Sequence, residues 1–274
     1  DHTALEVIFT EAQVYLLGEQ DQLAAPVPFR EFVAEARLGV SAAEHEDFFR
    51  KMLGDIEEPT APFGWMDVQG DGGAIVEAHL PVDDDVSRAI RRCARTAGVS
   101  AASLCHLAWA QVLARLTNRE EVVFGTVLFG RLHGGEGVTR GVGLFMNTLP
   151  LRLSIAGQDV REALQSTHER LGQLLRHEHA SLAQTQRCSA VPAESPLFTT
   201  LFNYRYASAS AESEQSERGW EGMEMLHVEE RSNYPLTLSV DDFGEAFGLT
   251  VQVREQVEPL RICDPLEDAV WPAV

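Results

Sequence analysis

The stretch that most constrains the fold covers residues 122–152 and reads VVFGTVLFGRLHGGEGVTRGVGLFMNTLPLR. Two apolar, β-rich runs, residues 122–129 and 142–153, flank a glycine-rich segment. The runs are continuous rather than alternating, which is typical of strands buried on both faces. The stretch therefore predicts strand, long loop, strand. Two interpretations stay open, namely one wall of a tunnel, or a buried strand pair joined by a mobile surface loop.

Composition and charge narrow the class of protein. With 274 residues and 45% hydrophobic content, the chain can form one large domain or two small ones. Its formal charge of -20 argues against sequence-independent binding to nucleic acid or to an anionic membrane, because both need a positive surface. The longest apolar helical run, residues 101–116, is too short to span a bilayer, and no signal peptide is visible.

Cysteine usage points to a reducing compartment. The cysteines Cys93, Cys105, Cys188 and Cys263 lie far apart, with no CxxC motif and no histidine at zinc-finger spacing. We therefore expect neither a disulfide framework nor a zinc site, and a cytoplasmic location. The first residue is Asp rather than Met and begins a helical pattern, so we expect the chain to be a piece of a longer protein.

The first 73 residues read as helices followed by a linker. Periodicity predicts helices over residues 3–17, 29–38 and 42–53, and Gly18 and Gly54 end the first and third of them. Ser41 and Glu44 form a capping box for the third helix. Residues 55–73 are rich in Pro, Gly and Asp, so we place the main domain boundary there.

The remaining residues predict alternating strands and helices. The expected helices cover residues 83–97, 101–116 and 159–179, and the expected strands cover 74–80, 197–206, 227–230, 236–240 and 247–253. Residues 207–218, ASASAESEQSER, predict a mobile polar excursion. Asp241 and Asp242 are expected in a hairpin turn. The predicted fold class is α/β with a mixed sheet flanked by helices.

Several chemically active side chains also have simpler structural explanations. The run Asp83–Asp85 can bind a metal but is typical of a solvated helix start. His106, on a largely apolar helix, is a candidate general base or a packed, hydrogen-bonded residue. His177 and His179 are two residues apart, which disfavours a shared metal site on a helix. Motifs for serine hydrolases, P-loop proteins, zinc proteases and kinases are absent from the sequence.

Several segments together resemble the condensation domain of nonribosomal peptide synthetases, a member of the chloramphenicol-acetyltransferase-like superfamily. VVFGTVLFGR, residues 122–131, looks like that family's floor-loop motif, and VGLFMNTLPLR, residues 142–152, looks like its Asn-Thr motif. Residues 98–116, 196–205 and 233–240 support the match in the same order along the chain. The resemblance covers nearly the whole chain but is thinner over residues 265–274.

The resemblance assigns roles to particular residues. The family carries a His-His-x-x-x-Asp-Gly motif at the junction of two lobes, and Asp1 matches its Asp, so both active-site histidines would precede residue 1. His2, which stands where Gly is usual, is neither of them. Residues 1–54 would end the amino-terminal lobe, 55–73 would be a linker, and 74–274 would form the carboxy-terminal lobe.

The same resemblance places supporting residues on the second lobe. Asn147 would be a polar group of the site, although capping a strand end is an equal alternative. Arg131 would pair with Asp1 across the tunnel, and Gly125 and Gly130 would give the floor loop a close backbone approach.

The expected activity is amide-bond formation between a donor acyl thioester on one carrier and an acceptor amine on another. No metal or bound cofactor is expected, because phosphopantetheine arms arrive with the carriers as part of the substrates. Partners would be donor and acceptor carrier domains, an adjacent adenylation domain and the missing amino-terminal lobe. The chain alone would be inactive. Two alternatives remain, a stand-alone acyltransferase of the same superfamily and a non-catalytic interaction lobe.

Overall fold

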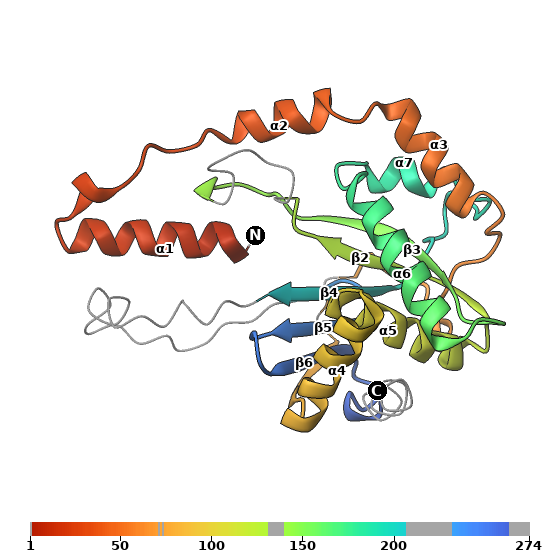
Figure 1. Ribbon diagram of the computed structural model, residues 1–274. Coiled ribbons are helices and arrows are strands. Elements are labelled where there is room, and N and C mark those ends of the chain that lie inside the picture. The colour runs from red at the N-terminus through yellow and green to blue at the C-terminus, as the bar shows by residue number, and fades with distance from the viewer. Residues whose placement is uncertain (1, 71, 73, 131–139, 207–231, 263–274) are drawn as a thin grey trace. The chain divides into compact units, whose positions relative to one another are not determined.

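Figure 1 shows the computed structural model of the chain, which describes residues 2–70, 72, 74–130, 140–206 and 232–262. These residues pack into two compact units. The smaller contains the described residues among 1–41 and 129–147, and the larger those among 42–128, 148–207 and 231–274. Several sequence predictions lie outside the described residues, namely Asp1, Arg131, Cys263, the strand over 227–230 and the excursion over 207–218.

The smaller unit consists of helices and the glycine-rich segment. Helix α1 covers His2–Leu16, a short 3-10 turn covers Gln20–Gln22, and α2 covers Phe29–Leu38. Gly18 follows α1 with φ +74°, the left-handed conformation that favours glycine at a helix end. Phe29 and Phe32 of α2 pack on Phe145, with ring centroids 5.2 and 4.5 Å away.

This aromatic packing corrects one predicted strand. Residues 142–153 were expected to form a continuous strand, but strand β3 covers only Asn147–Ser154. A Cβ atom at Gly143 would overlap the ring of Phe29, and one at Gly130, where φ is +65°, would overlap the carbonyl oxygen of Phe145. The segment before Asn147 therefore packs against α2 instead of extending the strand.

The larger unit contains one mixed sheet of six strands in the order β1-β6-β5-β4-β2-β3. The other strands are β1 (Ile75–Pro81), β2 (Glu121–Leu128), β4 (Thr200–Tyr206), β5 (Leu236–Asp242) and β6 (Phe247–Arg254). Strands β2, β4 and β5 run parallel, whereas β6 is antiparallel to both β5 and β1. The predicted mixed α/β sheet is confirmed.

Helices α4 (Asp84–Ala97) and α5 (Ala101–Thr117) cover one face of this sheet (Figure 1). The rings of His106 and Trp109 on α5 pack against Phe202 of β4. Arg91 on α4 lies over the ring of Phe247 and forms an ion pair with Asp242 at 2.6 Å. Successive side chains of a strand point to opposite faces of the sheet. Residues an even number of positions from Phe202 on β4, or from Asp242 on β5, therefore face the helices as these two residues do.

The remaining helices of the larger unit are α3 (Ala42–Leu53), α6 (Val160–Leu175) and α7 (Leu182–Gln186). The expected helix over residues 159–179 is too long, because α6 ends at Leu175 and both His177 and His179 follow it. Asp242 was expected in a turn but ends β5, where Arg91, Tyr204 and the Gly244 N–H donate to its carboxylate.

The packing also bears on residues 55–73. Thr60 lies in a bridge with Phe198, and its hydroxyl accepts a 2.9 Å bond from the Val123 N–H, so this part of the predicted linker is fixed to the sheet. Contacts divide the chain after Ser41, and α3 belongs to the larger unit. The lobe boundaries inferred from the resemblance stay a prediction for the intact domain.

Candidate functional site

The face of the sheet turned away from α4 and α5 is polar across four strands. Strand register places Asn203, Ser239, Thr250 and His79 in one row, and Leu201, Thr237, Gln252 and Glu77 in the next. Arg205 and Asp241 continue the pattern toward the ends of β4 and β5. We call this set of residues, without Leu201, the polar face. Its hydroxyl, amide, imidazole and carboxylate groups contrast with the apolar side chains that alternate with them toward the helices.

Much of the polar face is internally hydrogen-bonded. The imidazole of His79 lies 2.9 Å from the Thr250 hydroxyl through Nδ1 and 2.7 Å from the Glu77 carboxylate through Nε2. The amide of Gln252 donates to the other Glu77 oxygen at 2.7 Å. Arg205 donates two bonds to Asp241, at 2.6 and 2.9 Å.

Two buried acceptors on the polar face have no hydrogen-bond partner among the described residues. They are the hydroxyl oxygen of Thr237, a residue only 6% exposed, and the amide oxygen of Asn203. A buried polar atom without a partner costs roughly 1–3 kcal/mol, so such atoms are rare and call for an explanation. Both atoms are candidates for a hydrogen bond with a group that is not part of the described residues.

Gly125 lies beside these groups on β2. It is in register with Leu201, and a Cβ atom at this position would overlap the side chains of Phe198 and Leu201. Any other residue at this position would require the neighbouring side chains to repack. The close approach at Gly125 lies within the sheet, at strand β2.

The other residues assigned by resemblance are placed as follows. Asn147 is the first residue of β3 and is half-buried, and Gly130 lies in the smaller unit beside Phe145. Asp1 and Arg131 lie outside the described residues, so their ion pair stays a prediction. Among the described residues, Cys93, Cys105 and Cys188 form no disulfide.

His106 fits the packed interpretation. Its Nδ1–H donates to the Ala102 carbonyl at 2.7 Å, and its Nε2 accepts from the Thr126 hydroxyl at 2.7 Å. Complete burial lowers its pKa from 6.5 to about 4, so the ring is neutral near pH 7. Both ring nitrogens are thus used inside the core.

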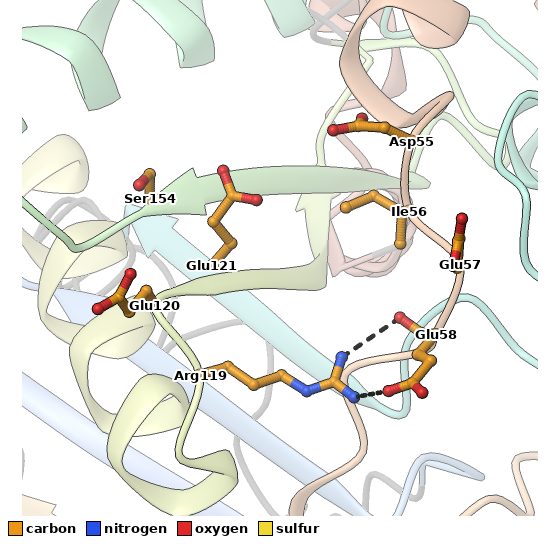
Figure 2. Close-up of a pocket in the computed structure, with 8 residues that line it drawn as sticks. All are labelled: Asp55, Ile56, Glu57, Glu58, Arg119, Glu120, Glu121 and Ser154. Atoms are coloured by element: carbon orange, nitrogen blue, oxygen red, sulfur yellow. Dashed lines mark hydrogen bonds and ion pairs between the residues drawn. The ribbon is translucent and has the colours of Figure 1, made fainter.

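Figure 2 shows an open pocket of about 580 Å³ where the chain enters β2 and leaves β3. Its lining carries the carboxylates Asp55, Glu57, Glu58, Glu120 and Glu121. Arg119 reaches across the pocket to the Glu58 carboxylate at 2.6 Å.

A second arginine, Arg152 on β3, reaches two other carboxylates of this pocket. Its side chain is 13% exposed, and its guanidinium binds Asp55 and Glu121 at 2.5 and 2.6 Å and donates to the Met52 carbonyl at 3.0 Å. These ion pairs brace the end of α3 against β2 and β3, and we assign the pocket a structural role.

Sequence reasoning missed Glu77 and His79 as partners, although their spacing of two in a predicted strand indicates a shared face.

Within the described ranges, no three His, Cys, Asp or Glu side chains form a metal-binding group. No single described helix is long and apolar enough to cross a membrane, while the bent pair α4–α5 meets that test of length and composition jointly.

The fold defines the class of protein first. The condensation domain from the Monacolin K polyketide synthase MokA matches with a TM-score of 0.71 and 20% identity, over 100% of this chain and 66% of that chain. The fold is therefore the α/β fold of condensation domains.

The sequence then identifies the family. The model of the condensation domain matches residues 8–257, and the chain belongs to this family. Malpibaldin synthetase of Mortierella alpina is 46% identical over 270 residues, which are 98% of this chain and 5% of that protein. Bacitracin synthase 1 of Bacillus licheniformis is 26% identical over 96% of this chain and 5% of its own length. The chain thus spans a small fraction of the curated relatives that it matches.

Proposed function

We propose that this chain is part of a condensation domain of a nonribosomal peptide synthetase. In its intact form the domain joins a donor acyl group on one carrier to an acceptor amine on another. The observation that carries this proposal is the 46% identity to a synthetase over 98% of the chain. The motif segments over residues 122–131 and 142–152 support it.

The reaction is an acyl transfer. The acceptor nitrogen attacks the thioester carbonyl carbon, the C–N bond forms, the C–S bond breaks, and the amine proton leaves with the departing thiol. The domain has to position two carrier arms, accept the proton and stabilise the developing oxyanion, and positioning supplies the larger share. No resident cofactor is needed, because phosphopantetheine arms belong to the substrates.

Within this proposal the proton-accepting histidines precede Asp1, and this chain supplies the facing side of the site. Asn147 acts as a polar group at the start of β3, and Arg131 pairs with Asp1 to hold the two lobes together. Gly125 and Gly130 keep the backbone close to its neighbours, which is supported by the overlap that a Cβ atom would make at either position.

The polar face supplies the contact surface for the arms. A phosphopantetheine arm contains two neutral amides, which pair with hydroxyl and amide groups at little desolvation cost compared with charges. The unsatisfied oxygens of Thr237 and Asn203 are acceptors for amide N–H groups of this kind.

The proposal includes the partners and the compartment. Donor and acceptor carrier domains, an adjacent adenylation domain and the missing amino-terminal lobe complete the machinery. The wide spacing of the cysteines and the lack of a CxxC motif support a cytoplasmic location.

Reconstitution with loaded carriers tests the proposal. We expect a longer protein that includes the two upstream histidines to transfer the donor acyl group, as measured by the intact mass of the acceptor carrier, and the 274-residue chain alone to transfer none. Asn147→Ala in the longer protein should lower kcat/KM without lowering Tm. Turnover by the chain alone, or transfer from a small soluble thioester without carriers, would contradict the assignment.

A further inference from the structure

Two histidines from distant parts of the larger unit face each other. His45 lies on α3 and His177 follows α6, 132 residues later, yet their Nδ1 atoms are 2.9 Å apart. The ring centroids are 5.1 Å apart with an interplanar angle of 66°, so the rings meet edge to face. Neither histidine has a role in the proposed amide-forming reaction.

The surroundings keep both rings neutral. Burial is the largest cause that lowers the pKa of each ring. The neighbouring His179 lowers the pKa of His45 further, and His45 and then Arg176 lower the pKa of His177 further. Glu44 acts in the opposite direction on both. The neutral imidazole is the form that binds metal ions.

The rings are also held in place by packing. Phe48 stacks on His177 with centroids 4.1 Å apart and planes 7° apart, and Phe49 meets His177 edge-on. His45 is 6% exposed, whereas His177 is half-buried, so the pair is fixed on one side and reachable by solvent on the other.

We propose that His45 and His177 together bind a divalent transition-metal ion, with zinc as the reference ion, through their two Nδ1 atoms. Zinc–nitrogen bonds of about 2.0–2.1 Å place two nitrogens of a tetrahedral ion roughly 3.3 Å apart. From the observed separation of 2.9 Å, binding needs a small outward shift of the rings and a rotation that turns both Nδ1 lone pairs from each other toward the ion. Water completes the coordination shell on the exposed side.

The proton balance of binding is simple. In the pair without metal, one Nδ1 carries the proton and donates it to the other Nδ1. When the ion binds, that proton moves through solvent to Nε2 of the same ring, and both Nδ1 lone pairs face the ion. Both ligands stay neutral, and no net proton is released.

The bound ion links α3 to the segment after α6. Because the two histidines come together only in the folded chain, the ion binds the native state and stabilises it. At a free zinc concentration one hundred times Kd, the folding equilibrium constant rises about 100-fold.

Thermal unfolding under increasing zinc chloride tests the site in the whole protein, kept reduced with a non-thiol reductant. We expect a saturable rise in Tm with zinc and none with magnesium, which prefers oxygen ligands. His45→Gln and His177→Gln should abolish the rise. His168→Gln is the matched control, because this imidazole on α6 bonds to the Ser103 hydroxyl, away from the pair, and should leave the rise intact.

A second measurement does not depend on the variants folding. Nitrogen-15 NMR of the wild-type imidazoles should show two Nδ1 signals shifted by the metal and two protonated Nε2 atoms. The proposal is overturned by the absence of these shifts in millimolar zinc, or by a zinc-dependent rise in Tm that survives in the His45→Gln/His177→Gln double variant.

Discussion

The Thr237→Val variant tests two effects of the Thr237 hydroxyl separately, namely its effect on the free energy of unfolding and its effect on acyl transfer. The change exchanges a buried hydroxyl that lacks a partner among the described residues for a methyl group of nearly equal size. The unsatisfied hydroxyl costs roughly 1–3 kcal/mol, so Thr237→Val should raise the free energy of unfolding by about 1–2 kcal/mol. For a chain of this length that corresponds to roughly 2–8 °C in Tm.

Two further threonines provide matched controls. Thr200 also has a buried hydroxyl without a partner in the described part of the chain, but it shares the face of Phe202 toward α5. Thr200→Val should therefore stabilise by a similar amount. Thr126→Val should instead destabilise by about 1–3 kcal/mol, because it leaves the buried Nε2 of His106 without its partner.

The assay compares urea unfolding with acyl transfer in the intact domain. If the Thr237 hydroxyl bonds a carrier arm, Thr237→Val loses one neutral hydrogen bond, worth about 0.5–1.5 kcal/mol, and kcat/KM falls roughly 2- to 10-fold. Thr200→Val should leave the rate unchanged. A loss of stability in Thr237→Val, or equal rates for both valine variants, refutes the reasoning.

The remaining predictions concern the ion pairs and the buried imidazole. Arg152→Met should lower the free energy of unfolding, measured in urea, by about 1.5–3 kcal/mol, because it removes charge-assisted bonds made by a mostly buried side chain. The control Arg50→Met, at an exposed ion pair, should change the free energy of unfolding little. His106 has a folded pKa of about 4, below its unfolded value of 6.5, so its contribution is complete above pH 6.5 and is lost as the pH falls toward 4. The loss is about 3 kcal/mol, and His106→Gln should remove that part of the pH dependence in unfolding titrations between about pH 7.5 and 4.5.

Local signals in the sequence predicted most helices well. Gly18 lies just after α1 with φ +74°, and Gly54 directly follows α3, as predicted for glycines at helix ends. These features depend on neighbours within a few residues. The family motifs identified the fold class for a different reason, since they compare whole segments with known proteins.

What the sequence did not predict depends on long-range packing. Phe145 leaves the strand pattern because it packs on Phe29 of α2, which lies far away in the sequence. His45 and His177 carry no shared motif, and only the packing of α3 beside α7 and its neighbours brings them together. The polar face required the strand order, which periodicity does not supply.

The pairing of β1 with β6 has a consequence for how the chain is made. Glu77 and Gln252 are bonded across 175 residues, so β1 leaves the ribosome long before its partner exists. At about 5–20 residues per second, the wait is roughly 9–35 s. During that time β1 has an open edge on the nascent chain. Slower synthesis over residues 81–247 therefore lengthens the time during which β1 can pair with another strand.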